Sequence, residues 1–205
     1  MKSTSLFLVG LATIASVAAV RQNATTHIIA GEPTQSWSLT DSNGKKHSLS
    51  DYKGKFVVLE WTNKDCPFVR KHYESGNMQA TQAKAKEMGA VWLTIISSAP
   101  GNQGYLSPSE ANAYRSEMKV KSAATLFDTA GKVGRNYGAK TTPQIVVLDK
   151  AGNVVYNGAI DDRATPDPED IKGAKNYALA ALSEAMAGKK VTVATSRPYG
   201  CSVKY

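Results

Sequence analysis

One stretch of the sequence decides the fold: Phe56-Val57-Val58-Leu59-Glu60-Trp61-Thr62-Asn63-Lys64-Asp65-Cys66-Pro67-Phe68-Val69-Arg70. It opens with a nearly continuous apolar run, which is typical of a strand buried on both faces of a sheet. The run stops at polar residues, and a segment compatible with a helix begins at Cys66-Pro67. The N-terminus of a helix stabilises a thiolate, because its free N–H groups and its dipole favour negative charge. We therefore interpret Cys66 as a reactive cysteine at a strand-to-helix junction.

The beginning of the chain has the features of a secretory signal peptide. Met1-Lys2 precedes an apolar run from Leu6 to Val20, with small residues near its end. A basic start, a short apolar run and a small-residue exit make up such a peptide, and the run is short for a membrane span. We assign residues 1–19 to the signal peptide, with an uncleaved anchor as the alternative. We expect a secreted or periplasmic protein without stable membrane insertion.

The basic charge of the chain is spread over its surface. The formal net charge is +8, but lysine and arginine stand mostly singly or in pairs such as Lys45-Lys46. No basic run alternates with aromatic residues, as a nucleic-acid site would require. A solvated basic surface accounts for the excess of positive charge. We expect no nucleic-acid partner.

Candidate metal ligands are few and lack a ligand spacing. The chain has two cysteines, Cys66 and Cys201, and three histidines, His27, His47 and His72. Zinc and copper sites need several such residues close together. We expect neither a metal nor another cofactor.

Hydrophobic period and turn residues predict an alternation of strands and helices after residue 35. The expected strands are 37–39 and 47–49 as a hairpin, then 56–62, 90–96, 125–128, 141–149, 154–158 and 190–194. The expected helices run from Cys66 to Glu74 and over 77–88, 109–119, 132–137 and 171–187. Residues 97–109 are a loop that either borders the site or is an ordinary connection.

This order of elements resembles the thioredoxin superfamily, and within it the redoxin group, also called the alkyl hydroperoxide reductase/thiol-specific antioxidant (peroxiredoxin-like) family. The resemblance covers residues 35–187. It is carried by Leu39-Thr40-Asp41-Ser42-Asn43-Gly44-Lys45, Leu49-Ser50-Asp51-Tyr52-Lys53-Gly54-Lys55, the strand leading to Cys66-Pro67, Thr142-Pro143 and Leu148-Asp149-Lys150-Ala151-Gly152. It implies an α/β thioredoxin-like fold, with a central mixed sheet flanked by helices and an N-terminal β-hairpin. It also implies that Cys66 is the nucleophile and that a cis bond precedes Pro143 beside the sulfur. The alternative is a trans proline that opens an edge strand.

The chain departs from both familiar chemistries of this superfamily. The second position of the thioredoxin C-x-x-C motif is Val69, so exchange within that motif is impossible. The peroxiredoxin signature P-x-x-x-T-x-x-C has Leu59 and Asn63 in place of its proline and threonine. The peroxiredoxin arginine is also missing, since Thr142-Pro143 stands there. These departures disfavour efficient peroxide reduction.

The second cysteine lies far away in the sequence, in the tail segment Pro198-Tyr199-Gly200-Cys201. A tail of this kind can reach back to another site, and some peroxiredoxin-like proteins carry a similar Gly-Cys-Ser near the C-terminus. We therefore expect Cys201 to pair with Cys66, either as a resolving thiol or as a standing disulfide. A purely structural disulfide closing so large a loop would contribute about 4 to 5 kcal/mol.

Residues around Cys66 are candidates for tuning its reactivity or contacting a substrate. Lys64 and Arg70 should lower its pKa, and the adjacent Asp65 should oppose them. We expect Asp65 to cap the helix rather than to carry protons. His72 lies on a different helix face and is a weaker candidate for a base. The candidates for substrate contact are Trp61, which could instead pack in the core, Asn63, Pro67, Thr142 and Pro143.

These features predict an exported thiol-disulfide oxidoreductase with an antioxidant or redox role, using Cys66 as nucleophile and Cys201 as its partner. The substrate would be a protein or small-molecule disulfide or peroxide, with a thiol as electron donor. One alternative is slow peroxiredoxin-like hydroperoxide reduction, and another is a non-enzymatic binding domain with an inert disulfide. The domains are the signal peptide (1–19), an extended lead-in (20–34), a thioredoxin-like domain (35–195) and a tail (196–205).

Overall fold

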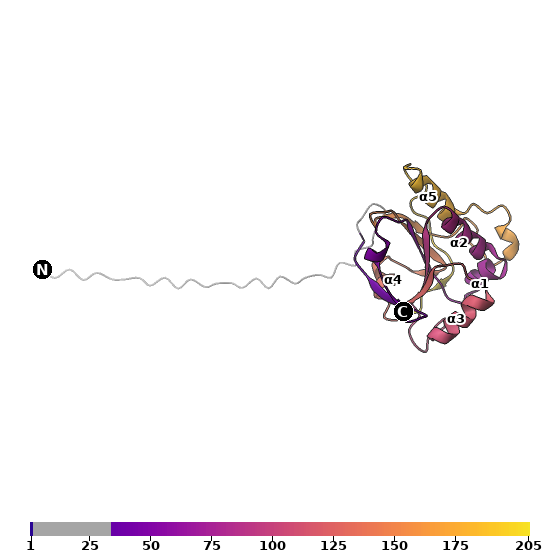
Figure 1. Cartoon of the computed structure of the whole chain (residues 1–205), viewed down its shortest axis with the longest axis horizontal. Helices are drawn as coiled ribbons and strands as arrows, with labels where there is room; N and C mark the ends of the chain where they lie inside the picture. Colours follow the sequence, from indigo (N-terminus) through magenta and orange to yellow (C-terminus); the bar gives the residue numbers. More distant parts are fainter. Residues whose placement is uncertain (2–33) are drawn as a thin grey trace.

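The computed structural model describes Met1 and residues 34–205 (Figure 1). The expected signal peptide and residues 20–33 of the lead-in lie outside the described residues. Within the described part, no helix is long and apolar enough to cross a membrane.

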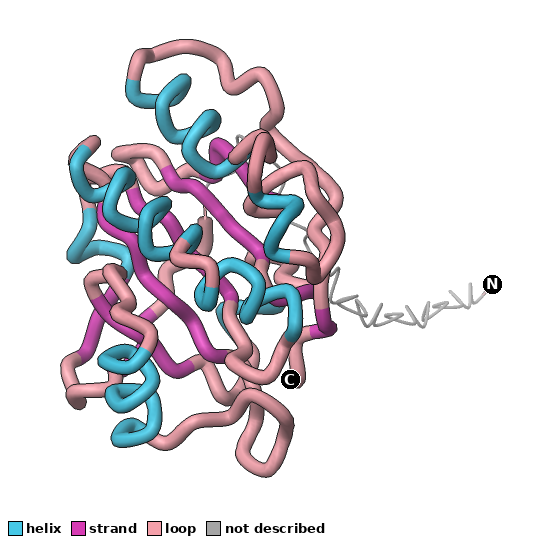
Figure 2. The backbone as a smooth tube through the Cα atoms, turned by 90° about the vertical axis from the view of Figure 1, so that its right-hand side faces the viewer, coloured by secondary structure: helices cyan, strands magenta, loops and turns pink. Residues whose placement is uncertain are grey.

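A seven-stranded mixed sheet forms the centre of the molecule (Figure 2). Its strand order is β2-β1-β5-β4-β3-β7-β8, and a separate two-stranded sheet joins β6 to β9. The strands are β1 (Ser38–Asp41), β2 (Lys46–Ser48), β3 (Val57–Trp61), β4 (Val91–Ile96), β5 (Ala124–Phe127), β6 (Thr141–Thr142), β7 (Gln144–Leu148), β8 (Val154–Gly158) and β9 (Cys201–Ser202).

Five α-helices and two short 3-10 helices connect these strands. They are the helices α1 (Pro67–Glu74), α2 (Asn77–Glu87), α3 (Pro108–Glu117), α4 (Lys132–Asn136) and α5 (Tyr177–Met186), and the 3-10 helices η1 (Leu49–Tyr52) and η2 (Pro168–Ile171). Helices α1, α2 and α5 pack on one face of the sheet in one core cluster, and α4 packs on the other face in a second cluster. A mixed sheet covered by helices on both faces confirms the predicted α/β class, and β1 and β2 form the predicted N-terminal hairpin.

Strand β3 occupies the position that its apolar sequence predicts. It pairs in parallel with β4 and antiparallel with β7, and all five of its residues are buried. Its single acidic residue, Glu60, is fully buried, and its carboxyl accepts hydrogen bonds from Tyr73, Gln82 and Trp92. A buried carboxyl needs such partners, because an unsatisfied polar group in a core is costly. The strand thus delivers the chain, through Trp61, to the loop that ends at Cys66.

Two predictions near the C-terminus are wrong. The helix expected over 171–187 begins at Tyr177, because the side chain of Asn176 accepts the Leu179 N–H as an N-cap and Gly173 adopts a left-handed φ of 82° before it. The strand expected over 190–194 does not form among the described residues. The Glu184 carboxylate takes the Thr192 N–H instead.

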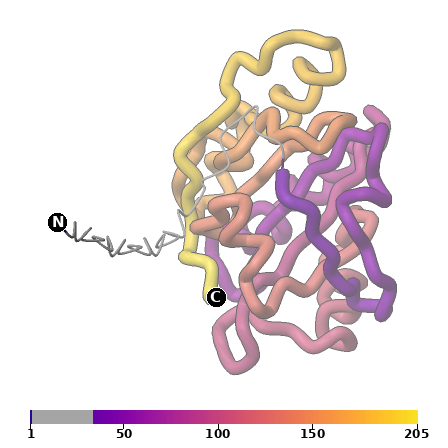
Figure 3. The backbone as a smooth tube through the Cα atoms, turned by 90° about the vertical axis from the view of Figure 1, so that its left-hand side faces the viewer, coloured from indigo at the N-terminus to yellow at the C-terminus, as the bar shows by residue number. Residues whose placement is uncertain are grey.

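The tail after these residues is more ordered than its sequence indicates. It runs along one side of the molecule from the end of α5 to the C-terminus (Figure 3). Thr195 forms an isolated bridge to Asn157, and Cys201–Ser202 form β9. This path brings the tail back to the loop that precedes β7.

Candidate functional site

Cys66 lies at the junction that the sequence predicts, as the N-cap residue of α1 with Pro67 at the first helical position. Its carbonyl accepts the N–H groups of Val69 and Arg70, which start the helix. The prediction that Asp65 caps this helix is wrong, because its side chain accepts from Lys64 and from the Gly104 N–H. The Cys66 side chain is 0 % exposed, so the thiol is shielded from solvent in this conformation.

The peptide bond between Thr142 and Pro143 is cis, as predicted. The Thr142 carbonyl oxygen lies 3.0 Å from Cys66 Sγ. Strands β6 and β9 pair antiparallel, with Thr142 directly opposite Cys201. The Cys201 N–H points at Cys66 Sγ across 3.4 Å. Both cysteines are free thiols, and the fold has brought them together from 135 residues apart.

The pKa values of the two thiols are shifted in opposite directions. Burial opposes ionisation of Cys66, but hydrogen bonds from the Cys201 thiol, the Cys201 N–H and the Val69 N–H outweigh it and lower the pKa of Cys66. Burial, the hydrogen bond to Cys66 and the negative charge of Cys66 raise the pKa of Cys201 to about 11. Of the two thiols, Cys66 is therefore the one that loses its proton more readily.

Gly200 allows the close approach of the tail to the cis-proline loop. Its φ is 119°, a conformation that side chains rarely adopt, and a Cβ there would lie 2.0 Å from the Thr142 carbonyl oxygen. Only glycine permits both the backbone conformation and the contact. Gly200 therefore lets the chain before Cys201 pack directly against the Thr142 carbonyl beside Cys66.

Further contacts hold the tail beyond Cys201. The Val203 N–H donates to the Lys140 carbonyl across 3.0 Å, and the Tyr205 hydroxyl donates to the Ala139 carbonyl across 2.7 Å. The Lys204 carbonyl accepts the Ala99 N–H across 2.9 Å. The loop after β4 therefore touches the tail, and through Gly104 it also touches the approach to Cys66. The loop borders the site rather than being an ordinary connection.

The proposed substrate-contact residues fall into two groups. Asn63 and Thr142 contact Cys66 through their carbonyl oxygens, and Pro67 and Pro143 directly follow Cys66 and Thr142 in the chain. The side chain of Asn63 is buried, with its oxygen accepting the Asp65 N–H. Trp61 packs in the core cluster on the opposite face of the sheet, where its indole N–H donates to Ser97. The structure does not bring Trp61 to the thiol.

The cations that the sequence offers for tuning Cys66 have other partners. Lys64 Nζ lies 2.6 Å from Asp65, and Arg70 Nε lies 2.7 Å from Glu74 on the exposed face of α1. The main polar contacts to the Cys66 sulfur come from Cys201, Val69 and Thr142 instead.

His72 is buried beneath the tail with its two ring nitrogens in use. Nδ1 lies 2.7 Å from the Asn77 side-chain amide, and Nε2 lies 3.1 Å from the Tyr199 hydroxyl. The pKa of His72 is lowered to about 4, mainly by burial. The negative charge of Asp161 raises this pKa, and the positive charge of Lys71 lowers it further. His72 is therefore neutral at pH 7.

We predict that this histidine makes the fold sensitive to acid. The unfolded pKa of about 6.5 exceeds the folded value, so the unfolded chain binds more protons between them and stability falls as the pH falls. Lowering the pH from 7 to 4 should cost about 3 kcal/mol through His72. Urea unfolding of the wild type and of His72→Gln at both pH values measures this, because the variant lacks the titrating ring. An equal loss of stability in both proteins would contradict the prediction.

No cluster of three or more metal-ligating side chains occurs among the residues that the structure describes. His47 bonds to Asp41 and Tyr52 in the N-terminal hairpin. Near Cys66, the Asp65 carboxylate is paired with Lys64.

Three residues that contribute to this site were not identified from the sequence. Tyr199, Asp161 and Gly200 each belong to a stretch that reads as loop or tail, with no period or motif. The Gly-Cys-Ser similarity of the tail points to Cys201 and gives no role to Gly200 itself.

Comparisons with known proteins agree with the geometry. The model of the Redoxin family matches residues 29–177. No curated protein matches the chain. An uncharacterized conserved protein from Geobacillus kaustophilus is similar in structure, with a TM-score of 0.72 and 23% identity, covering 93% of this chain and 98% of that one.

Two structures of thiol redox proteins are also similar. The exposed lipoprotein thioredoxin of Streptococcus pneumoniae has a TM-score of 0.52 and 26% identity, covering 73% of this chain and 99% of its own. A secreted disulfide oxidoreductase of Mycobacterium tuberculosis has a TM-score of 0.50 and 16% identity, covering 72% of this chain and 94% of its own.

These likenesses confirm the thioredoxin-like fold, and the family supports a thiol redox function. The family model spans most of the domain, including both Cys66 and the cis-proline loop. The chain belongs to the Redoxin family.

Proposed function

We propose that this protein is a thiol-disulfide oxidoreductase in which Cys66 is the nucleophile and Cys201 the resolving thiol. One observation carries the proposal: β9 pairs with β6 so that Cys201 stands opposite Thr142 and beside the Cys66 sulfur. The pKa of Cys66 is lowered and that of Cys201 is raised, which suits Cys66 to attack first and Cys201 to resolve. Thiolate is the attacking species in disulfide exchange.

The first step consumes a substrate disulfide. The Cys66 thiolate attacks one sulfur of the substrate, a Cys66–substrate S–S bond forms, and the substrate S–S bond breaks. The other substrate sulfur leaves as a thiolate and takes a proton from solvent. Since Cys66 is buried, the tail has to move aside before this attack.

The second step returns the tail to its place. Cys201 loses its proton to solvent or to the leaving sulfur and attacks Cys66 Sγ. The Cys66–Cys201 bond forms, the mixed disulfide breaks, and the second substrate sulfur leaves as a thiol. The substrate disulfide has then been reduced to two thiols, while the protein dithiol has been oxidised to a disulfide. A dithiol donor restores the protein by the reverse exchange.

Slow hydroperoxide reduction has weaker support. The position of the peroxiredoxin threonine is held by Asn63, whose oxygen accepts the Asp65 N–H and whose amide donates to the Gln103 carbonyl. Asn63 therefore lacks the hydroxyl of the peroxiredoxin threonine, and its side chain is tied to Asp65 and Gln103. Export by residues 1–19 to a secreted or periplasmic location remains part of this proposal on the sequence alone.

The reduction potential of the Cys66–Cys201 pair tests the proposal against an inert disulfide. Equilibration in dithiol buffers, followed by acid quenching and mass mapping, gives the potential. We expect a value above about −300 mV, the range of labile and catalytic bonds. A value well below this would identify a structural bond, and failure of the bond to form at any poise would exclude Cys201 as the resolving thiol.

A further inference from the structure

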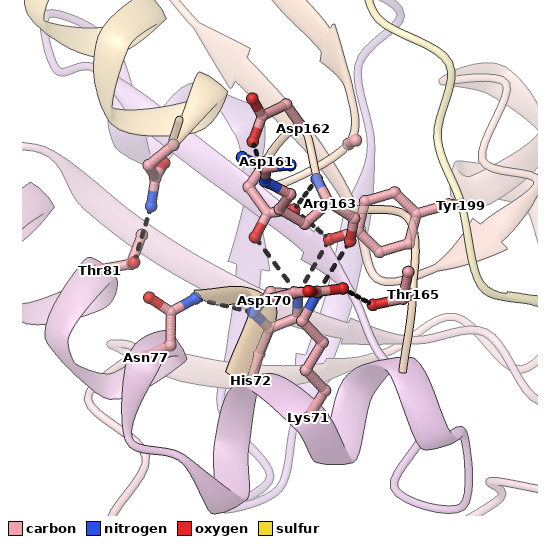
Figure 4. A network of polar contacts seen from close by, with 12 residues as sticks. Lys71, His72, Asn77, Thr81, Asp161, Asp162, Arg163, Thr165, Asp170 and Tyr199 are labelled. Atoms are coloured by element: carbon pink, nitrogen blue, oxygen red, sulfur yellow. Dashed lines mark hydrogen bonds and ion pairs between the residues drawn. The ribbon is translucent and has the colours of Figure 1, made fainter. Parts of the chain in front are cut away.

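Tyr199 joins the tail to the helix that carries Cys66. Its ring packs against Phe68, with centroids 5.8 Å apart, and Lys71 Nζ lies 5.8 Å from the ring centre. His72 contributes the third contact from α1. Figure 4 shows the ring lying beside Lys71 and His72, with its hydroxyl directed toward Asp161.

The Tyr199 hydroxyl lies inside a chain of hydrogen bonds, between His72 and Asp161. It donates to Asp161 Oδ1 across 2.5 Å and lies 3.1 Å from His72 Nε2. The Asn77 amide lies 2.7 Å from His72 Nδ1. Because the amide donates to Nδ1, the neutral ring carries its proton on Nε2 and donates it to the Tyr199 oxygen. The chain therefore runs in one direction, from Asn77 through His72 and Tyr199 to the carboxylate.

The Tyr199 hydroxyl remains a hydrogen-bond donor to the Asp161 carboxylate. Burial and the neighbouring Asp161 raise the pKa of Tyr199 well above its usual range, so the hydroxyl keeps its proton. The other carboxylate oxygen, Oδ2, is buried without a hydrogen-bond partner among the described residues. A hydrogen bond to a buried charge is among the stronger ones in proteins.

Tyr199 is also placed to control Cys201. Tyr199 precedes Cys201 by two residues, so their Cα atoms are at most about 7 Å apart. The Tyr199 ring packs against Phe68 of α1, and Cys66 is the N-cap residue of the same helix. We propose that Tyr199 is a positioning residue: its hydroxyl, held by Asp161 and His72, keeps β9 on β6 and thereby sets how often Cys66 is uncovered. The inference rests on the proposed function for its biological meaning, since uncovering Cys66 admits substrate and recovering it brings back the resolving thiol.

The test measures access to Cys66 without using any redox reaction. The chain has two cysteines, so Cys201→Ser leaves Cys66 as the single thiol and keeps the β9 backbone. In that background, the rate of Cys66 alkylation by iodoacetamide reports opening of the tail. Tyr199→Phe keeps the ring contacts with α1 and removes the hydroxyl. We expect alkylation to become about tenfold faster.

Tyr137→Phe is the matched control. Its hydroxyl is also buried and accepts a hydrogen bond, from Trp37, but it lies in the core cluster on the other face of the sheet. Val203 of the tail packs against this cluster, but the Tyr137 hydroxyl bonds to Trp37 and not to the tail. Its loss lowers global stability and keeps the packing, so alkylation should change less than about twofold. Rates should depend little on low urea concentrations, because the opening is local.

Asp161→Asn provides a second variant outside the tail, and it removes the charge that accepts from Tyr199. It should accelerate alkylation in the same direction. Unchanged rates in both Tyr199→Phe and Asp161→Asn, or an equal acceleration in Tyr137→Phe, would overturn the inference. Either result would leave the redox proposal standing. Conversely, if the wild type formed no Cys66–Cys201 disulfide, the redox proposal would fail but the alkylation result would not change.

Discussion

Replacing Cys66 by serine should reduce the rate of peptide-disulfide reduction by at least about 10³-fold. A serine hydroxyl is not ionised at neutral pH and does not attack a disulfide, so the first step has no nucleophile. Turnover is measured as release of thiols from a disulfide peptide, with a dithiol as electron donor. Loss of activity in this assay is the largest effect that the proposed mechanism predicts.

The fold of Cys66→Ser should survive, which separates the mechanism from a structural staple. The serine hydroxyl can donate to the Thr142 carbonyl, which lies 3.0 Å from the present sulfur. Under reducing conditions, where no disulfide exists in either protein, we expect the free energy of unfolding to fall by only about 1 to 2 kcal/mol. Retained turnover in a folded Cys66→Ser protein would exclude Cys66 as the nucleophile. If only the oxidised wild type is more stable, by about 4 to 5 kcal/mol, and neither protein turns over, the bond is a staple.

Replacing Cys201 by serine should stop the reaction after its first step. Cys66 keeps its place at the N-terminus of α1 and still attacks, but the mixed disulfide then has no neighbouring thiol to resolve it. Turnover should fall by about 10²-fold or more, since resolution becomes bimolecular. Mass spectrometry without reductant should find one substrate sulfur bound to each protein molecule, at Cys66.

The control for this variant is the double substitution at Cys66 and Cys201, which should form no adduct. Full turnover by Cys201→Ser would show that an external thiol resolves the intermediate and that the pairing of β6 with β9 serves another purpose. An adduct that appears in the double variant would locate the reaction elsewhere in the chain.

The reactive junction and the cis-proline loop could be predicted because their signals are local. An apolar run that ends at Cys66-Pro67 specifies a strand followed by a helix, and Thr142-Pro143 specifies a loop. Both are set by residues adjacent in the sequence. The thioredoxin-like architecture followed from the order of such local elements.

The sequence predicts that the tail brings Cys201 to Cys66, but the contacts that order the tail could not be predicted, because they join residues distant in the sequence. A two-residue strand such as β9 has no period, and its partner Thr142 lies 59 residues away from Cys201. Asp161, His72 and Tyr199 look ordinary one by one, and only the fold joins them. Their meeting depends on three separate elements packing together.

The roles expected of Lys64 and Arg70 show a different limit. Each cation has an acidic neighbour in the sequence, Asp65 or Glu74, and pairs with it in the structure. Charge proximity in the sequence thus indicates cations near Cys66 without showing which carboxylate neutralises them. The acidity of Cys66 depends instead on hydrogen bonds from Cys201 and from the first turn of α1.

The most direct test of the account is a single turnover by the wild type with one equivalent of a disulfide peptide. Mass mapping after acid quenching identifies the bond that remains in the protein. We predict that the protein becomes lighter by two hydrogen atoms, carries a Cys66–Cys201 disulfide, and has released both peptide sulfurs as thiols. A lasting mixed disulfide at Cys66, or a protein left fully reduced beside intact substrate, would contradict the central claim that these two cysteines act as a pair.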